Sequence, residues 1–408
     1  MTETAERIEN LLSLVREKMG LSLGWTDDQV REMIDEVLLA QSGVPVEEKL
    51  RLKKVLFDEL RGFGVIQDLL EDPQITEIMI NGPDRIFIEK EGRLFPTQRR
   101  FASREKLEEM IRRMASRVNR TINESRPIAD VRLADGSRVN MVLSPVAVDG
   151  PAVTIRKFAA EAMTLEQMTE RGSITAEAAE FLKRAVECHS NILISGGTGS
   201  GKTTFLNALS AFIPEDERVI TIEDSAELQL VKIPNLVRLE VREANLEGRG
   251  EITIRDLVKS ALRMRPTRII IGETRDQAAA DLLGAWNTGH DGSLSTIHAN
   301  STQDALTRLE TLVMTGAEIP LPAIRAQMAS AIDLIVHLGR IRDGSRRVLE
   351  ITQVLGMSGG EIRLRKLFTY TRAPEEDEGS EGVLVAEGPL PRPEEKYRGS
   401  AGDAAGRR

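Results

Sequence analysis

Residues 191–210, NILISGGTGSGKTTFLNALS, decide how this chain folds. They join an apolar run typical of a buried strand, a loop of the form G-x-x-x-x-G-K-[ST], and a segment with helical character. Glycines let backbone N–H groups approach phosphate oxygens, and the dipole of the following helix favours negative charge. A glycine-rich turn with a surface lysine is the alternative, but the flanking strand and helix favour a nucleotide-binding loop.

The loop supplies the first set of predicted site residues. We expect Lys202 to reach the β- and γ-phosphates of a bound nucleotide, and the Thr203 hydroxyl to bind Mg²⁺. The residues predicted to bind the nucleotide are Gly197, Thr198, Gly199, Ser200, Gly201, Lys202, Thr203 and Thr204.

Acidic residues follow two further strand-like runs. RVITIE ends in Glu223, with Asp224 and Glu227 close behind, and RIII is followed by Gly272 and Glu273. The carboxyl ends of parallel strands are where open α/β sheets bind ligands. Glu223 is therefore a candidate to orient Mg²⁺ or to deprotonate the attacking water, and Glu273 a candidate metal-linked or water-linked acid. For residues 224–227 a capped turn is the alternative.

Two of the four histidines, His290 and His298, lie in the run TGHDGSLSTIHA at 288–299. Zinc is a poor explanation, because no third and fourth ligands stand at metal-ligand spacing. Imidazole hydrogen bonds that sense the γ-phosphate are the functional interpretation. A partly buried structural histidine is the alternative for either one alone.

Arginines form two groups. Arg132 and Arg138 flank the turn at Asp135-Gly136, and Arg156 ends the next predicted strand. As a set, arginines suit the delivery of positive charge to a triphosphate across a mobile contact. Any single surface arginine is more often only solvated. The second group surrounds the Glu273 strand and comprises Arg263, Arg265, Arg268 and Arg275.

Composition excludes several classes of protein. The 408 residues are 41% hydrophobic and 3% aromatic with a net charge of -9, which argues against nucleic acid as a partner. A single cysteine, Cys188, rules out an internal disulfide and a multi-cysteine zinc module, so no structural zinc is expected. The first residues lack an export signal, and no window approaches the ~20 apolar residues of a membrane span. We expect a cytoplasmic protein that meets the membrane through partners.

The period of the apolar residues changes along the chain and predicts five segments. A helical N-terminal region, a smaller α+β domain, a polar hinge, an α/β domain and a largely disordered acidic tail follow in that order. Their bounds are 1–63, 64–158, 159–174, 175–372 and 373–408. Alternating helices and strands predict a parallel sheet in the fourth segment. Strand-like runs at 346–354 and 361–368 predict a terminal antiparallel pair.

Four segments together resemble the secretion and pilus ATPase superfamily. NILISGGTGSGKTTFLNALS, RVITIEDSAELQL, RIIIGETR and TGHDGSLSTIHANS match its Walker A, Asp box, Walker B and His box in order. Upstream, ITEIMINGPDRIFIEKEGR and LADGSRVNMVLSPV look most like the branch that assembles tight-adherence (Tad/Cpa, Flp-type) pili. The similarity covers roughly residues 50 to 370. The tetracysteine zinc insert of some branches is missing.

This resemblance implies an α/β fold with a RecA-like P-loop ATPase domain, preceded by a helical region and a smaller α+β, PAS-like domain. It implies a cytoplasmic homohexamer that uses ATP and Mg²⁺ and drives a platform protein of the inner membrane. The implied function is ATP hydrolysis that powers assembly of a Tad/Flp-type pilus or protein secretion.

The resemblance also assigns roles to residues. Glu223 is the favoured general base and Glu273 the Walker B acid. Thr203 is the implied ligand of Mg²⁺, with Glu223 as a second candidate. The implied catalytic set is Glu223, Glu273, Lys202, His298, Arg138 and Arg156, with Arg132 as a further source of charge. His290, the other histidine of the His box, is expected to bind the nucleotide.

Other functions compete with this one. A type IV secretion or conjugation ATPase would share all four motifs and serve a different envelope machine. An ATP-binding scaffold with little hydrolysis is a candidate of another class, which the two acids Glu223 and Glu273 argue against. A nucleic-acid motor is the weakest candidate, because the chain is acidic and poor in aromatic residues.

Overall fold

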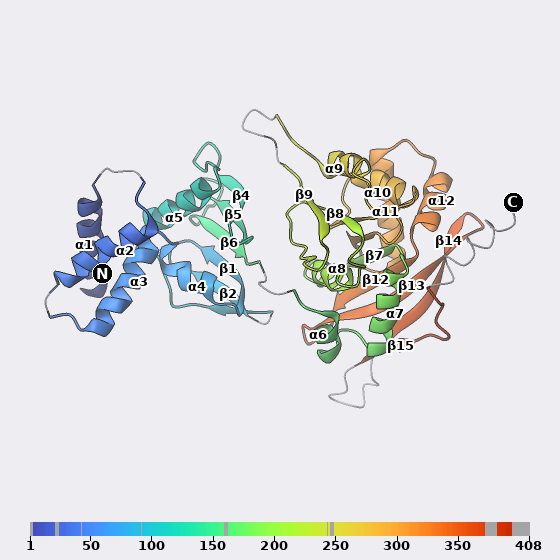
Figure 1. The fold of residues 1–408 in the computed structure, drawn as a ribbon, viewed down its shortest axis with the longest axis horizontal. Helices are drawn as coiled ribbons and strands as arrows, with labels where there is room; N and C mark the ends of the chain where they lie inside the picture. Colours follow the sequence, from blue (N-terminus) through green and yellow to red (C-terminus); the bar gives the residue numbers. More distant parts are fainter. Residues whose placement is uncertain are drawn as a thin grey trace. The chain divides into compact units, whose positions relative to one another are not determined.

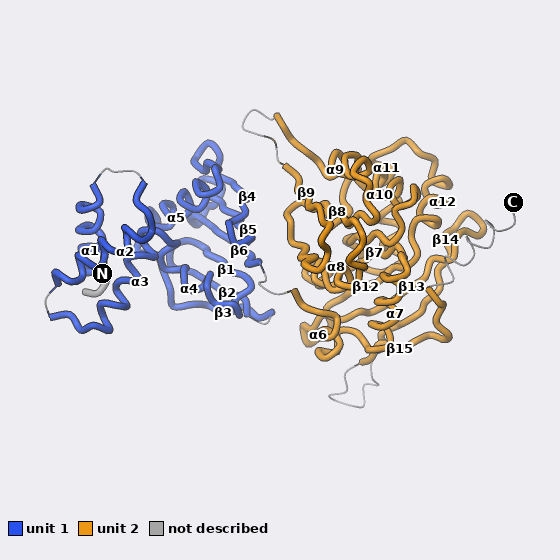
Figure 2. The backbone as a smooth tube through the Cα atoms, viewed as in Figure 1, with its two compact units in different colours: residues 1–160 blue, residues 161–408 orange. Residues whose placement is uncertain are grey.

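The computed structural model consists of two compact units, Met1–Ala160 and Glu161–Arg408 (Figure 2). Each unit is described by itself. The residues that the structure describes are 3–20, 24–41, 43–90, 92–158, 162–242, 244, 249–371 and 382–393.

The first unit begins with three helices that share a small core. They are α1 (Glu3–Met19), α2 (Asp27–Leu39) and α3 (Val46–Leu60). Thr26 and Gln29 form a capping box that begins α2, which satisfies otherwise unpaired N–H groups of the first turn. Buried side chains from all three helices, such as Val15, Ile34 and Leu56, pack together.

The rest of this unit is an antiparallel sheet with helix α5 (Arg104–Arg117) on one face. The 3₁₀ helix η1 (Gly64–Ile66) and α4 (Gln67–Glu71) lead into it. The strand order is β3-β2-β1-β6-β5-β4. The strands are β1 (Ile75–Asn81), β2 (Ile86–Lys90), β3 (Arg93–Pro96), β4 (Ile128–Arg132), β5 (Arg138–Val142) and β6 (Ala152–Arg156). Alternate residues of β5 and β6 are buried, so one face meets the core and the other remains open.

The second unit is built on one mixed sheet of order β15-β14-β13-β12-β7-β11-β10-β8-β9 (Figure 1). The six strands from β12 to β9 in that order are parallel, and β12 to β15 are antiparallel. The strands are β7 (Ile192–Gly196), β8 (Arg218–Glu223), β9 (Asn235–Glu240), β10 (Arg268–Ile271), β11 (Leu294–His298), β12 (Leu334–Arg340), β13 (Arg346–Ser358), β14 (Glu361–Thr371) and β15 (Val383–Ala386).

Helices cover both faces of this sheet. One core gathers α6 (Leu165–Glu170), α7 (Ala176–Glu187) and α8 (Lys202–Ser210) against the strands. The other core gathers α9 (Ile254–Ala261), α10 (Ala278–Trp286), α11 (Thr302–Gly316) and α12 (Leu321–Ala331). Every residue of β7 and β10 is buried, as expected for parallel strands covered on both sides. The predicted α/β class is confirmed, as is the terminal antiparallel pair β13–β14.

Two segments differ from the sequence-based expectation. Helix α6 occupies part of the predicted hinge, and its Leu165 and Met168 are buried in the core of the second unit. In the predicted disordered tail, β15 pairs with β14 and buries Leu384, so that prediction was wrong for 383–386. The local apolar run VLV was hidden by its polar surroundings. Hinge residues 159–161, tail residues 373–381 and 394–408, and residue 372 at the end of the predicted α/β domain lie outside the described part of the chain.

Across the described ranges, none of the helices combines the length and apolar character that a bilayer span requires.

Candidate nucleotide site

Four parallel strands bring the predicted motifs to one edge of the sheet. The glycine loop follows β7, Glu223 ends β8, Glu273 follows β10 and His298 ends β11. These strands are neighbours in the order β7-β11-β10-β8. Because the carboxyl ends of parallel strands meet at a common edge, segments far apart in sequence converge there. The observed convergence is the geometry that a ligand site of this sheet type needs.

The glycine loop has the shape of an anion cradle. Gly199 and Gly201 have φ angles of +69° and +91°, which favour glycine, and Gly201 is the N-cap of α8. A Cβ atom on Gly197 or Gly199 would meet nothing within 4 Å, so one side of the loop is open. Ser200 is buried, and its hydroxyl has no hydrogen-bond partner among the described residues. These features fit phosphate oxygens at the start of a helix.

Lys202 lies beneath this loop and is only 7% exposed. Its Nζ donates to the carbonyl oxygens of Gly196 at 3.0 Å and Gly197 at 2.9 Å. Burial lowers the pKa of the Lys202 ammonium, while the charge of Glu273 acts in the opposite direction. The lysine is thus held where its charge faces the loop and the neighbouring acids.

His298 connects Lys202 to Glu273. Lys202 Nζ lies 3.3 Å from His298 Nδ1, and His298 Nε2 lies 2.9 Å from Glu273 Oε1. Burial and the nearby Lys202 charge lower the pKa of His298, which favours a neutral ring. Because an ammonium can only donate, Nδ1 must accept and Nε2–H must donate to the carboxylate. Sequence reasoning placed both groups here, but this bridge between them was not foreseen.

Arg275 extends the network to the next strand. Its Nε lies 3.0 Å from Glu273 Oε2, and its second nitrogen lies 2.5 Å from Asp224 Oδ2. Both carboxylate oxygens of Glu273 therefore have partners. Of the arginines predicted around this strand, Arg275 is the one that the structure brings to the loop edge.

Glu223 stands in a different environment. It is 3% exposed, and its Oε1 accepts the backbone N–H groups of Glu227 at 2.8 Å and Leu228 at 3.0 Å. Its Oε2 is buried and has no partner among the described residues. Burial raises the pKa of this carboxyl group. The turn after β8 is therefore capped by Glu223, the residue directly before the segment 224–227 in which the sequence allowed a capped turn.

Gly272 makes room for Glu223 on the neighbouring strand. A Cβ atom on Gly272 would lie 3.0 Å from Glu223 Cγ. That separation is shorter than ordinary carbon contacts, so a larger residue would push the carboxylate away.

His290 does not join the loop within this unit. It precedes β11, whereas His298 ends the same strand, and five strand residues span about 15 Å. Its Nδ1 lies 3.1 Å from the carbonyl oxygen of Ala285 at the end of α10. The prediction that His290 contacts the nucleotide therefore has no support in this unit. Strand β11 separates His290 from His298, so the two histidines of the motif lie at opposite ends of this strand.

Arg268 and its neighbours also differ from the prediction. Arg268 is fully buried and holds Glu217 with two bonds of 2.6 and 2.7 Å. It lies at the amino end of β10, so it ties down the edge opposite the loop. Arg263 and Arg265 are exposed before that strand and fit the solvated alternative.

Arg132, Arg138 and Arg156 are neighbours in the first unit. Arg138 pairs directly with Arg132 on β4 and with Arg156 on β6. Opposed residues share a face of a sheet, and the buried residues alternate with them, so the row lies on the face away from α5. The structure thus brings the three predicted arginines together, on a unit separate from the loop.

The sequence reasoning missed residues on β12 and β13. His337 is buried beside the loop strand, and its Nδ1 lies 3.0 Å from Ser195 Oγ. Burial lowers the pKa of His337. Arg346 approaches the loop itself, at Gly201. Four arginines within 340–347, directly after an apolar strand, were the available signal.

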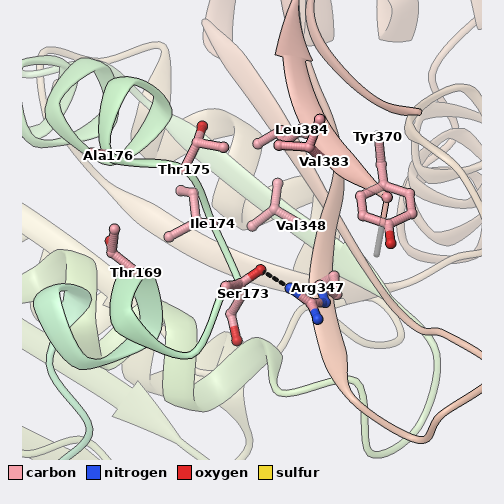
Figure 3. Close-up of a pocket in the computed structure, with 12 residues that line it drawn as sticks. Thr169, Ser173, Ile174, Thr175, Ala176, Arg347, Val348, Tyr370, Val383 and Leu384 are labelled. Carbon is pink, nitrogen blue, oxygen red and sulfur yellow. Dashed lines mark hydrogen bonds between the residues drawn. The ribbon is translucent and has the colours of Figure 1, made fainter. Parts of the chain in front are cut away.

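A cavity of about 370 Å³ lies elsewhere in this unit, beside the connection from α6 to α7 (Figure 3). Arg347 points into its wall and donates to the carbonyl oxygen of Gly172, and Val348 N donates to Ser173 O at 2.8 Å. These bonds fasten the connection to β13. None of the loop residues lines this cavity, so it is separate from the candidate site.

Comparisons with known proteins agree with this geometry. Residues 59–359 match the family described as type II/IV secretion system protein. A "Putative conjugal transfer protein" of Mycobacterium tuberculosis is 35% identical over 336 residues, 81% of this chain and 95% of that protein. The type IV secretion system protein VirB11 of Brucella suis is 35% identical over 306 residues, 68% of this chain and 85% of that protein. The X-ray structure of the ATPase DotB of Legionella pneumophila has a TM-score of 0.51 at 22% identity, covers 70% of this chain and 78% of its own, and shows likeness of fold alone.

Proposed function

Because this chain belongs to the type II/IV secretion system protein family, we propose that it is an ATPase that powers a macromolecular machine of the bacterial envelope. The resemblance to secretion and pilus ATPases is thereby confirmed. The observation that carries the proposal is the convergence of the glycine loop, Glu223, Glu273 and His298 on one sheet edge. We further propose a RecA-like second unit, a PAS-like sheet domain in the first, and a cytoplasmic hexamer that meets a platform protein at the inner membrane.

Residue roles follow from the contacts. Lys202 and the loop N–H groups would hold the phosphates, and Thr203 would bind Mg²⁺, which supplies neutralising charge when present. Glu223 suits the general base, since its Oε2 has no competing partner within the described part of the chain and its raised pKa makes it a stronger proton acceptor. Both oxygens of Glu273 are engaged, which suits the Walker B acid as part of a fixed charged network.

His298 and the arginines complete the proposed machinery. His298 touches both Lys202 and Glu273, so it can report a change at the phosphates to the acid. Arg138 and Arg156, with Arg132, would add positive charge from the first unit during hydrolysis. Because the three arginines form a single row on the sheet, they could act together on the same phosphates.

Two machines are candidates for the work. Segments 75–93 and 133–146 support assembly of a Tad/Flp-type pilus. The relatives, a putative conjugal transfer protein and a type IV secretion system protein, favour conjugation or type IV secretion. Deleting the gene and scoring surface pili and DNA transfer in the same strain separates the two.

The proposal is tested by ATP turnover with Mg²⁺. Lys202→Ala should lower the rate by at least about 100-fold, because one charged contact to the transition state is commonly worth that much. Lys183→Ala is the matched control, since this half-exposed lysine lies on α7. Equal rates for Lys202→Ala and wild type would refute the proposal. Wild-type turnover no faster than that of Glu223→Gln would favour the scaffold.

A further inference from the structure

Strand β12 lies directly against the glycine loop. Leu338 of β12 is in register with Gly196, the last residue of β7. A Cβ atom on Gly196 would lie 2.5 Å from the Leu338 carbonyl oxygen, so glycine is what permits this approach. Since β12 and β7 are parallel, the turn from β12 to β13 leaves the sheet at the same edge as the loop.

Arg346, the first residue of β13, reaches the loop from this turn. A Cβ atom on Gly201 would lie 3.4 Å from Arg346 Cδ. Gly201 is the N-cap of α8, where unpaired backbone N–H groups and the helix dipole favour an anion. Ser200 stands one residue away, and its buried hydroxyl finds no partner in the described ranges. The Arg346 side chain therefore passes beside the N-cap of the helix that follows the cradle.

Arg340 reinforces this positive charge. It is paired directly across from Arg346, and both side chains are exposed. Two positions back, the opposed Leu338 and Val348 lie in the core that contains α8, so the arginines share the α8 face of the sheet. Among the described residues, neither arginine has a carboxylate partner. Like charges directly opposite one another destabilise a strand pair, and a bound anion removes that repulsion.

Arg347, the next residue of this basic run, has a structural role. Its buried guanidinium bonds to Gly172 and Ser345, which ties β13 to the α6–α7 connection (Figure 3). Packing therefore explains Arg347, while it leaves Arg340 and Arg346 unexplained.

The sheet order says which part of a nucleotide these arginines face. The order is β12-β7-β11-β10-β8, so β12 and β11 flank the loop strand on opposite sides. Glu223, Glu273 and His298 all lie on the β11 side, where the terminal phosphate would be cleaved. The arginines lie on the β12 side, away from that chemistry.

We infer that Arg346, assisted by Arg340, binds the non-transferred phosphates of a nucleoside di- or triphosphate. The inference rests on the proposed nucleotide site and adds a cationic clamp from the unit that carries the loop. A guanidinium presents a fork of donors that matches two phosphate oxygens. Because ADP and ATP share these phosphates, the clamp sets affinity for both and leaves the cleavage step nearly unchanged.

The test is ADP and ATP affinity by titration calorimetry, with kcat and KM for ATP. Arg346→Ala should weaken both affinities about tenfold or more, the usual size of a lost charge-assisted bond. It should raise KM similarly and leave kcat within about twofold, because uniform binding is lost. Arg346→Lys should recover part of the affinity, and Arg340→Ala should show a smaller loss in the same direction.

Arg342→Ala is the matched control, because it removes the same charge from the same turn. It should leave ADP affinity within about twofold of wild type, since an exposed charge that makes no bond to the phosphates acts only through a field that salt screens. If Arg342→Ala lost as much ADP affinity as Arg346→Ala, the effect of Arg346 would be general electrostatics, and the proposed clamp would be refuted. Unchanged ADP affinity in Arg346→Ala, or a fall in kcat without one in affinity, would overturn it as well.

Lys202→Ala separates this inference from the proposed function. If wild type binds ADP and Lys202→Ala does not, the nucleotide site stands, and the Arg346 result decides the clamp alone. If wild type binds neither nucleotide, both fail together. The Tm of Arg346→Ala should equal or exceed that of wild type, because the variant removes the like-charge pair with Arg340.

Discussion

Replacing Glu223 with glutamine should stabilise the second unit at pH 8 while it abolishes ATP turnover. The wild-type carboxylate is 3% exposed, and its Oε2 has no partner among the described residues. Leaving a buried neutral polar atom unsatisfied costs about 1–3 kcal/mol, and a charged one costs more. Glutamine keeps an oxygen that can accept the N–H groups of Glu227 and Leu228 and puts a neutral amide nitrogen in the place of Oε2, so what the variant removes is the additional cost of the charge.

The net gain in folding free energy is smaller than the cost of the buried charge, because the hydrogen bonds from the N–H groups of Glu227 and Leu228 weaken. A charged acceptor makes bonds roughly twice as strong as a neutral one, so the two bonds together lose about 1 kcal/mol. Burial is nevertheless the dominant influence on the pKa of Glu223, which is raised. A net stabilisation of about 1 kcal/mol is therefore expected, equal to about 2–4 °C in Tm for a unit of this size.

The effect must depend on pH in one direction. With its pKa raised from 4.5 by folding, the carboxyl group binds protons more tightly in the folded state. Wild-type stability is therefore lost as pH rises from about 4.5 through the folded pKa. The Glu223→Gln variant lacks this loss, so the difference in Tm should grow from pH 5 to pH 8.

Thermal unfolding followed by circular dichroism over that range is the assay. Glu273→Gln is the control of opposite sign, because it removes an ion pair with Arg275 and a hydrogen bond from His298. That variant should lose about 0.5–1 kcal/mol at pH 8. A Glu223→Gln variant that is no more stable than wild type at pH 8 would show that the Glu223 carboxylate is well solvated. That result would also refute the assignment of Glu223 as the general base.

Two further predictions concern stability alone. Glu217→Gln should lower the free energy of unfolding by about 3–5 kcal/mol in denaturant titrations, because it leaves the charge of buried Arg268 uncompensated. The exposed substitution Glu215→Gln is its control, and equal denaturation midpoints for the two variants would contradict the expectation. Leu384→Ala should lower the free energy of unfolding by about 2–3 kcal/mol, because its side chain is buried where β15 joins the sheet. The exposed substitution Val383→Ala should change that free energy by less than about 0.5 kcal/mol. Identical losses for Leu384→Ala and Val383→Ala would show that the strand is not packed.

The glycine loop was predictable because its determinants are local. Positive φ at Gly199 and Gly201, the strand before them and the helix after them all follow from adjacent residues. The acids Glu223 and Glu273 were predictable for a related reason, since strand ends in a parallel sheet share an edge. The different surroundings of Glu223 and Glu273 were not predictable, because the partners of Glu273 are the side chains of His298 and Arg275, whose positions depend on the folded sheet.

Other features needed the assembled sheet. The tail strand β15 exists because β14 offers it an edge, and local composition hid that opportunity. The distance of His290 from the loop is another such feature, because β11 separates it from His298.

The sequence alone determined the nucleotide loop, the parallel sheet that carries it and the family of the chain, because each depends on short-range backbone preferences and on residues close together in the chain. Only the tertiary structure decided that Glu223 is buried, with one oxygen that no described residue pairs, and that Arg346 approaches Gly201. Those facts depend on the order β12-β7-β11-β10-β8 and its register. Strand order and register emerge from many weak contacts between distant segments, which no single stretch of sequence contains.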